Sequence, residues 1–206
     1  MTTKRCSSKS KRPIRPIDGR ADRCMASIRQ ALKDLATPVR AERSKSFFKT
    51  GAGEYGEGDV FIGISVPDLR KVAAAYRTLS LTEVDTLLHS QIHEERLLSL
   101  YILVLQFQQG DAQVKKEVYH HYLKHRKQVN NWDLVDCSAA YIVGVYLFER
   151  DRTILNEMIV SSNLWERRIA MVSTHYFIRQ QDFHTTLSLA QKLLDDPHDL
   201  LHKASG

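Results

Sequence analysis

Residues 93–128, HEERLLSLYILVLQFQQGDAQVKKEVYHHYLKHRKQ, decide the fold. Neither half of this stretch shows the period-two alternation of a half-buried strand, and the two halves read as helices over 93–109 and 112–128. The polar turn QQGD at 108–111 joins them. Consecutive helices linked by so short a turn pack antiparallel, which predicts a helical hairpin.

The same arrangement continues on both sides of this hairpin. Ser65 followed by Pro67, and Ser80 followed by Glu83, are typical helix-start signals. Further helices are predicted over 22–36, 39–48, 65–76, 81–89, 131–149, 152–160, 164–180, 183–194 and from 199 onward. Pairs spaced by roughly 35 to 45 residues favour an all-α fold, an α-solenoid of HEAT-like antiparallel helix pairs, over a simple bundle.

Basic charge is concentrated at the N-terminus. The chain has 206 residues, 43% of them hydrophobic, enough for one buried core. Its net charge is +6, but eight of the 30 basic and two of the 24 acidic residues lie in 1–23, so the remaining 183 residues carry 22 of each. We predict a disordered basic tail at 1–23 and a HEAT-like repeat domain at 24–206. The tail either raises encounter rates with polyanions or only solubilises the chain.

The cysteines and the hydropathy point to the cytoplasm. Cys6, Cys24 and Cys137 are odd in number and lack a CxxC spacing, which favours a reducing compartment and argues against a zinc site. No run approaches the 18 apolar residues that span a bilayer, and no apolar segment follows the basic N-terminus. We expect a cytoplasmic protein that neither enters a membrane nor is exported.

The histidines and glycines do not predict a metal or phosphate site. His121 with His125, and His198 with His202, have helical i,i+4 spacing, but neither first histidine is followed by the glutamate of a metalloprotease. We predict that both pairs lie on helix surfaces and that the protein uses no metal. The glycine-rich stretch GAGEYGEGDVFIGIS at 51–65 lacks the Gly-Lys-Ser/Thr ending of a phosphate loop and contains acids that would repel phosphate. It is better explained as a multiply turned connection.

The stretch NNWDLVD at 130–136 is the first candidate site. Asp133 is explained as a first-turn acid, which offsets the partial charge of a helix N-terminus. Asp136 lies one turn after Trp132, so both side chains share a face. They are either core and hydrogen-bonding residues or a site for a cationic ligand, because a ring face and a carboxylate both attract positive charge. Cys137 is a poor nucleophile, since the adjacent acid raises its pKa.

The stretch NLWERRIA at 163–170 is the second candidate site. Asn163 is a plausible N-cap, after which Trp165 begins one face of a helix. Arg167 and Arg168 point in different directions, so one can face solvent while the other faces a groove. They form either a solvated pair or a guanidinium that holds a phosphate.

These two stretches, with FFKTGAGEYGEGDVFIGISVPDLRK at 47–71, together resemble one family. They are similar to the AlkD-type DNA alkylation-repair proteins, DNA glycosylases built from HEAT-like repeats. The resemblance implies hydrolysis of the N-glycosidic bond of cationic alkylated purines, such as 7-methylguanine and 3-methyladenine, in double-stranded DNA. It also implies that no metal or organic cofactor is used and that the lesion needs no deep pocket. We expect a monomer that associates with the nucleoid when bound to DNA.

The resemblance also assigns roles to residues. Asp136 matches the family's catalytic aspartate, and Trp132 matches its aromatic partner one turn earlier. The arginine that contacts the DNA backbone best matches Arg168, with Arg167 as the register-shifted alternative and Trp165 beside them. An alkylated purine is already a cationic leaving group, so the carboxylate has only to stabilise the oxocarbenium-like sugar and position water.

The C-terminus departs from the family pattern. That pattern continues beyond HKASG at 202–206 with a helix that supplies a second tryptophan and another arginine. Either the sequence is a fragment, or it is a shortened family member whose excision activity is weakened or lost. The alternative functions are a non-catalytic HEAT-like DNA- or RNA-binding module and a protein-binding α-solenoid.

Overall fold

The computed structural model describes residues 21–206, with side chains from Met25 onward. Within this range the protein is built from helices without a named strand, and Val60 and Ile92 form an isolated parallel β-bridge. The all-α solenoid predicted from helix spacing is therefore confirmed. The predicted tail at 1–23 lies outside the described residues, except for its last three residues, which begin the first helix, α1.

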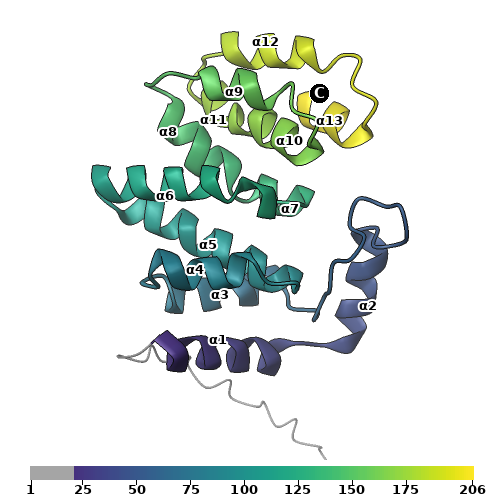
Figure 1. Cartoon of the computed structure of the whole chain (residues 1–206), viewed down its shortest axis with the longest axis vertical. Helices are drawn as coiled ribbons and strands as arrows, with labels where there is room; N and C mark the ends of the chain where they lie inside the picture. Colours follow the sequence, from purple (N-terminus) through teal and green to yellow (C-terminus); the bar gives the residue numbers. More distant parts are fainter. Residues whose placement is uncertain (1–20) are drawn as a thin grey trace, which may run out of the picture.

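The helices stack in layers along the long axis of the molecule, from α1 at one end to α12 and α13 at the other (Figure 1). The predicted hairpin is formed by α5 and α6 in the middle of the stack. The stacked helices of the N-terminal half are α1 (Ala21–Leu35), α3 (Val66–Ala75), α4 (Leu81–Leu88), α5 (His93–Gln109) and α6 (Ala112–Lys124), followed by the short 3-10 helix η1 (Arg126–Gln128). Those of the C-terminal half are α7 (Trp132–Asp136), η2 (Ala140–Gly144), α8 (Val145–Leu147), α9 (Thr153–Met158), α10 (Leu164–Ser173), α11 (His175–Arg179), α12 (His184–Lys192) and α13 (Asp199–Ser205).

One helix stands apart from these layers. The helix α2 (Pro38–Phe47) runs nearly upright beside the stack, and the glycine-rich loop at its end folds back toward α7 and the C-terminal helices (Figure 1). Pro38 lies at its first turn, where a missing N–H costs nothing. Only Ala41 of this helix is buried. Phe47, its last residue, and Phe48, the next residue, contact Trp132 of α7.

Two helices predicted as continuous are interrupted. The predicted helix 131–149 breaks after Asp136 into a turn, then continues through the π-helical η2 into α8. The hydroxyl of Ser138 donates to the carbonyl of Leu134 and contacts the Tyr122 hydroxyl, so it competes with the regular helical ladder. The predicted helix 164–180 divides at Thr174, whose hydroxyl donates to the carbonyl of Met171. Periodicity alone could not reveal either break.

A single hydrophobic core runs the length of the stack, from Ile28 in α1 to Ala204 in α13. Layers η2 and α10 approach closely at Gly144, where a Cβ atom would overlap the carbonyl oxygen of Ser173. No helix in residues 21–206 combines the length and apolar character needed to cross a membrane.

Candidate active site between α7 and α10

The N-terminus of α7 carries Trp132 against an aromatic wall. The side chain of Asn131 caps the helix by accepting from the Trp132 backbone N–H at 2.8 Å. The indole stacks on Phe48, with ring centroids 5.2 Å apart and an interplanar angle of 20°. Phe47 meets it edge-on at 5.6 Å while remaining 65% exposed. Trp132 is therefore positioned by residues more than eighty positions earlier in the chain, and it stays partly open to solvent.

Asp136, at the last turn of α7, is held by an arginine from α10. The guanidinium of Arg168 donates to both carboxylate oxygens, from Nε at 3.0 Å and from Nη2 at 2.8 Å. Its third nitrogen donates to the backbone carbonyl of Leu200 in α13. The Arg168 side chain is 8% exposed, whereas that of Asp136 is 40% exposed. The planar guanidinium thus fixes a carboxylate that still reaches solvent.

The other two residues predicted for this site are engaged elsewhere. Arg167 pairs through Nε with Asp196 at 2.8 Å and donates to the carbonyl of Ser161. Trp165 is 9% exposed. Neither arginine of the pair is a solvated surface residue, because each is clamped to an acid and to a backbone carbonyl. The structure pairs Asp136 with Arg168, with Trp132 one turn earlier on α7, and turns Arg167 toward Asp196, which lies between α12 and α13.

Tyr55 links the two tryptophans and was not foreseen from the sequence. Its ring meets Trp165 edge-on, with centroids 6.0 Å apart, and its hydroxyl hydrogen-bonds with the Trp132 side chain. Burial raises the pKa of Tyr55, and the bond to Trp132 partly offsets this rise. Lys49 lies over the same ring at 5.9 Å from its centroid. The glycine-rich loop therefore contributes to the site as well as connecting two helices.

This loop is anchored on the first turn of α5. The carboxylate of Glu94 accepts from the backbone N–H groups of Ile62, Gly63 and Ile64, the shortest contact being 2.7 Å to Gly63. Gly63 has a φ of +78°, and a Cβ atom there would overlap the carbonyl oxygen of Thr37. Gly53 and Gly58 also have positive φ, as the interpretation of this stretch as a multiply turned connection predicts.

A buried charged network ties the loop to α7. His93 donates from Nδ1 to Asp59 at 3.1 Å and from Nε2 to Asp133 at 2.8 Å, and Asp59 also pairs with Arg96. Burial opposes a charge on the imidazole, but its hydrogen bonds to Asp133 and Asp59 outweigh this and raise the pKa of His93 to about 9. The pKa of Asp59 is lowered, since its bonds to His93, Arg96 and Asn131 outweigh burial. The two cations, His93 and Arg96, thus balance the two anions, Asp59 and Asp133.

This network corrects the prediction for Asp133, which does more than offset the partial charge of a helix N-terminus. Asp133 anchors the start of α7 to α5, and through His93 it is linked to the loop. The prediction that Cys137 is a poor nucleophile is confirmed. Burial, and then the nearby charges of Asp133 and Asp136, raise the pKa of its thiol well above the usual value.

Comparison with known proteins identifies the family. A family model described as DNA alkylation repair enzyme matches residues 28–206, which is nearly the whole chain. The chain belongs to this DNA alkylation repair family. No individual curated protein matches it. The match spans both α7 and α10, and with them the Asp136 and Arg168 pair.

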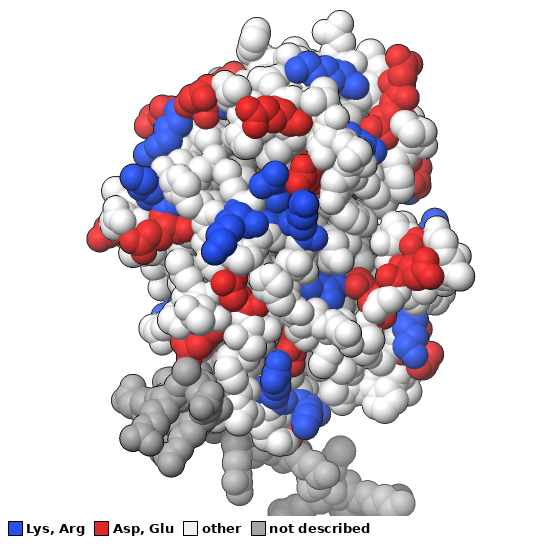
Figure 2. All heavy atoms as spheres, in the orientation of Figure 1, with Lys and Arg blue, Asp and Glu red and all other residues white. Residues whose placement is uncertain are grey.

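The surface of this DNA alkylation repair family member carries mixed charge, with local concentrations of basic residues. Figure 2 shows Lys and Arg side chains gathered near the middle of the face shown, over the region where α6 leads into α7. That segment contains Lys124, Arg126 and Lys127, and Arg126 pairs with Glu166 at 2.9 Å. A shallow cavity of about 380 Å³ on α2 is lined by Arg40, Arg43, Ser44, Phe47 and Ile64.

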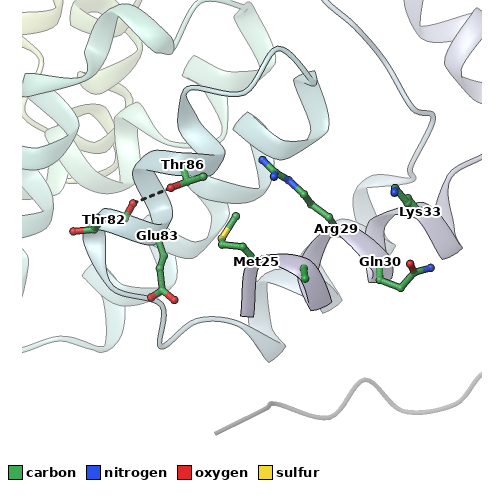
Figure 3. A pocket seen from close by; sticks show the side chains of 8 residues that line it. Met25, Arg29, Gln30, Lys33, Thr82, Glu83 and Thr86 are labelled. Carbon is green, nitrogen blue, oxygen red and sulfur yellow. Dashed lines mark hydrogen bonds between the residues drawn. The ribbon is translucent and has the colours of Figure 1, made fainter. Parts of the chain in front are cut away.

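A larger cleft of about 750 Å³ lies between α1 and α4, at the opposite end of the stack from α13. Figure 3 shows Arg29 and Lys33 of α1 facing this space, with Thr82 and Glu83 across it on α4. Residues of α7 and α10 take no part in its lining. The cleft is therefore separate from the family member's candidate active site.

Proposed function

We propose that this DNA alkylation repair family member is a DNA glycosylase that hydrolyses the N-glycosidic bond of cationic alkylated purines in double-stranded DNA. The observation that carries the proposal is the half-exposed carboxylate of Asp136, held in one orientation by Arg168 and lying one turn after the stacked Trp132. A fixed, solvent-accessible anion beside an aromatic face suits a substrate whose positive charge moves from the base to the sugar as it reacts.

The chemistry requires little from the protein. A purine alkylated on a ring nitrogen leaves as a neutral base, so no general acid is needed. The bond that breaks is the one between the sugar carbon C1′ and the base nitrogen, whose electron pair leaves with the base. Asp136 stabilises the resulting oxocarbenium-like sugar and orients the water, whose oxygen bonds to C1′ while its proton passes to the carboxylate and on to solvent. Trp132 lines the lesion beside the sugar.

Arg168 acts in this proposal as a positioning residue for Asp136. Its guanidinium already makes three hydrogen bonds and is 8% exposed, which leaves little of it for a phosphate. The DNA backbone is contacted instead by basic side chains around the site, those of α2 and of the segment after α6. Arg167 and Trp165 support the site through packing and the ion pair with Asp196.

The protein acts as a cytoplasmic monomer.

The test is single-turnover release of 7-methylguanine from double-stranded DNA. For Asp136→Asn, we expect an excision rate lower by about 100-fold or more, with a DNA dissociation constant within about threefold of wild type. For Arg168→Gln, we expect a loss of about tenfold in the excision rate, again with DNA binding retained, because the carboxylate remains but is no longer oriented.

Asp182→Asn is the matched control. Asp182 is also a partly exposed carboxylate paired with an arginine, at 2.8 Å from Arg152, but it lies away from α7. This variant should excise at the wild-type rate. Unchanged excision by Asp136→Asn would contradict the assignment.

The second candidate is a HEAT-like nucleic-acid-binding module without chemistry. The observation that favours it is that both oxygens of Asp136 are engaged by Arg168, as in a purely structural ion pair. In that case wild-type protein would bind DNA with a steep dependence on salt and release no base. A measurable wild-type excision rate decides against this candidate.

A further inference from the structure

A second cluster of histidines and an acid lies between α4 and α6, outside the candidate active site. The Nε2 atom of His121 lies 3.0 Å from Oδ1 of Asp85, and the Nε2 atom of His125 lies 3.5 Å from the same oxygen. The rings of His121 and His125 are 4.8 Å apart, and that of His89 meets His125 edge-on at 5.1 Å. The prediction that His121 and His125 lie on the surface is wrong, because their side chains are 9% and 14% exposed.

These polar atoms lie close to one another but without good hydrogen-bond geometry. Among the described residues, Oδ1 of Asp85 and the Nε2 atoms of His121 and His125 are buried without a hydrogen-bond partner, since their mutual geometry is not that of a hydrogen bond. Buried polar groups normally have partners, and three unpartnered atoms that converge on one point require an explanation. A bound cation provides one.

Two distances within the cluster match those of a transition-metal site. With metal–ligand bonds of about 2.0–2.1 Å, tetrahedral coordination places neighbouring ligand atoms about 3.3 Å apart. The separations of 3.0 and 3.5 Å within the cluster lie on either side of this value. The ligand atoms of Asp85, His89 and His125 all lie within 4.8 Å of one another, and His121, whose Nε2 atom is 3.0 Å from Asp85, joins them as the fourth ligand after a side-chain movement.

His89 is already oriented for this role. Its Nδ1 lies 2.9 Å from the backbone carbonyl of Asp85, an interaction that requires the proton to be on Nδ1. Nε2 is then left with its lone pair, which is the arrangement seen in metal-binding histidines.

We propose that Asp85, His89, His121 and His125 form a binding site for one divalent transition-metal ion of the Zn²⁺ type, which links the C-terminal ends of α4 and α6. Three imidazoles and one carboxylate favour Zn²⁺, Co²⁺ or Ni²⁺ over the oxygen-seeking Mg²⁺ and Ca²⁺. The ion is structural, because the ligands fill a tetrahedron and leave no position for a substrate. The proposal is independent of the excision chemistry at Asp136.

The experiment is a titration of the untagged full-length chain, stripped with a chelator, with Co²⁺ as a spectroscopic probe. Cys6→Ser and Cys24→Ser are introduced first, because N-terminal thiols compete for the ion. We expect one Co²⁺ per chain with the visible bands of tetrahedral coordination, displacement by Zn²⁺, and a melting temperature higher by about 5 °C or more at saturating metal.

Variants separate this site from any other. His121→Ala and His125→Ala should abolish the tetrahedral spectrum. His89→Ala, in which an exposed ring is removed and the fold is untouched, should weaken Co²⁺ binding by about tenfold or more. His202→Ala is the matched control, because it disrupts the other i,i+4 histidine pair, and it should bind Co²⁺ like wild type. No stoichiometric binding by the parent chain, or equal binding by the parent and His89→Ala, would overturn the proposal.

Discussion

Two clusters of histidine and aspartate in this stack have similar composition and opposite electrostatics. In the first, His93 lies between Asp59 and Asp133, donates from both ring nitrogens, and is charged at neutral pH. In the second, His121 and His125 lie against one aspartate, Asp85, without hydrogen-bond geometry, and burial keeps them neutral. The comparison teaches that partners decide the charge of a buried histidine, because burial alone always favours the neutral form.

The largest expected effect is the loss of stability on removing His93. His93→Ala leaves Asp59 and Asp133 without their shared partner, and breaking a buried ion pair in this way costs about 3–5 kcal/mol. Urea unfolding of the metal-free protein measures the change. His121→Ala, tested in parallel, should lose clearly less. Equal losses would mean that the two clusters do not differ as described.

The next effect concerns the loop that supplies Asp59. Gly63→Ala forces a side chain into the left-handed region and against the Thr37 carbonyl oxygen, so we expect a destabilisation of about 2 kcal/mol. The loop then withdraws Asp59 from His93, and the pKa of His93 falls. Histidine ring resonances in an NMR titration report that fall. Those of His121 and His125 should be unmoved, since among the described residues their ion pairs join them to Asp85 of α4 and to no residue of the loop.

The two clusters should also respond to pH in opposite directions. The folded pKa of His93, about 9, lies above the ordinary 6.5, so its contribution to stability is complete below pH 6.5 and is lost as the pH rises through 9. The folded pKa values of His121 and His125 are lowered, so their contribution is present above pH 6.5 and is lost as the pH falls below it. Melting temperatures of His93→Gln and His121→Gln, measured as a function of pH, separate the loss of stability at high pH from the loss at low pH. A wild-type slope retained above pH 7 in His93→Gln would contradict this account.

The smallest expected effect is that of His121→Gln in the presence of a chelator. His121 lies 3.0 Å from Asp85 without good hydrogen-bond geometry, so the free energy of unfolding should change by about 1 kcal/mol or less. Adding Zn²⁺ should widen the difference in the free energy of unfolding between this variant and wild type, because only the wild-type chain gains the binding free energy of the metal ion. A large loss without metal would instead show that His121 is a structural partner of Asp85.

The sequence predicted the helices well where the signal is local. The capping box at Ser80 and Glu83 is present, with the Ser80 N–H donating to Glu83 at 2.8 Å, and Asn163 caps α10 as expected. The helix after Asn131 was predicted too long, because its break depends on Ser138, whose hydroxyl meets Tyr122 on a neighbouring helix. Whether a hydroxyl competes with the helical ladder depends on its surroundings, which periodicity does not record.

The candidate site was predicted in part. Trp132 and Asp136 share a face because they are one turn apart, and the motif resemblance added Arg168. The binding mode of Arg168 was not foreseen. Its contact with Asp136 spans 32 residues, and its contact with Leu200 spans another 32 in the opposite direction. Tyr55 was also missed, because a tyrosine in a glycine-rich loop has no periodic context that would place it between two tryptophans.

The sequence by itself determined the all-α solenoid, the order of its helices, the family and the pairing of Trp132 with Asp136 on one face. These follow from periodicity, caps and short motifs, which act over one or two helical turns. Only the tertiary structure decided which buried groups are charged. It placed Asp59 and Asp133 on either side of His93, whereas it gave His121 and His125 one shared acid. The energy of an ion in the interior depends on partners within a few ångströms, and here the chain brings those partners from 34 to 40 residues away.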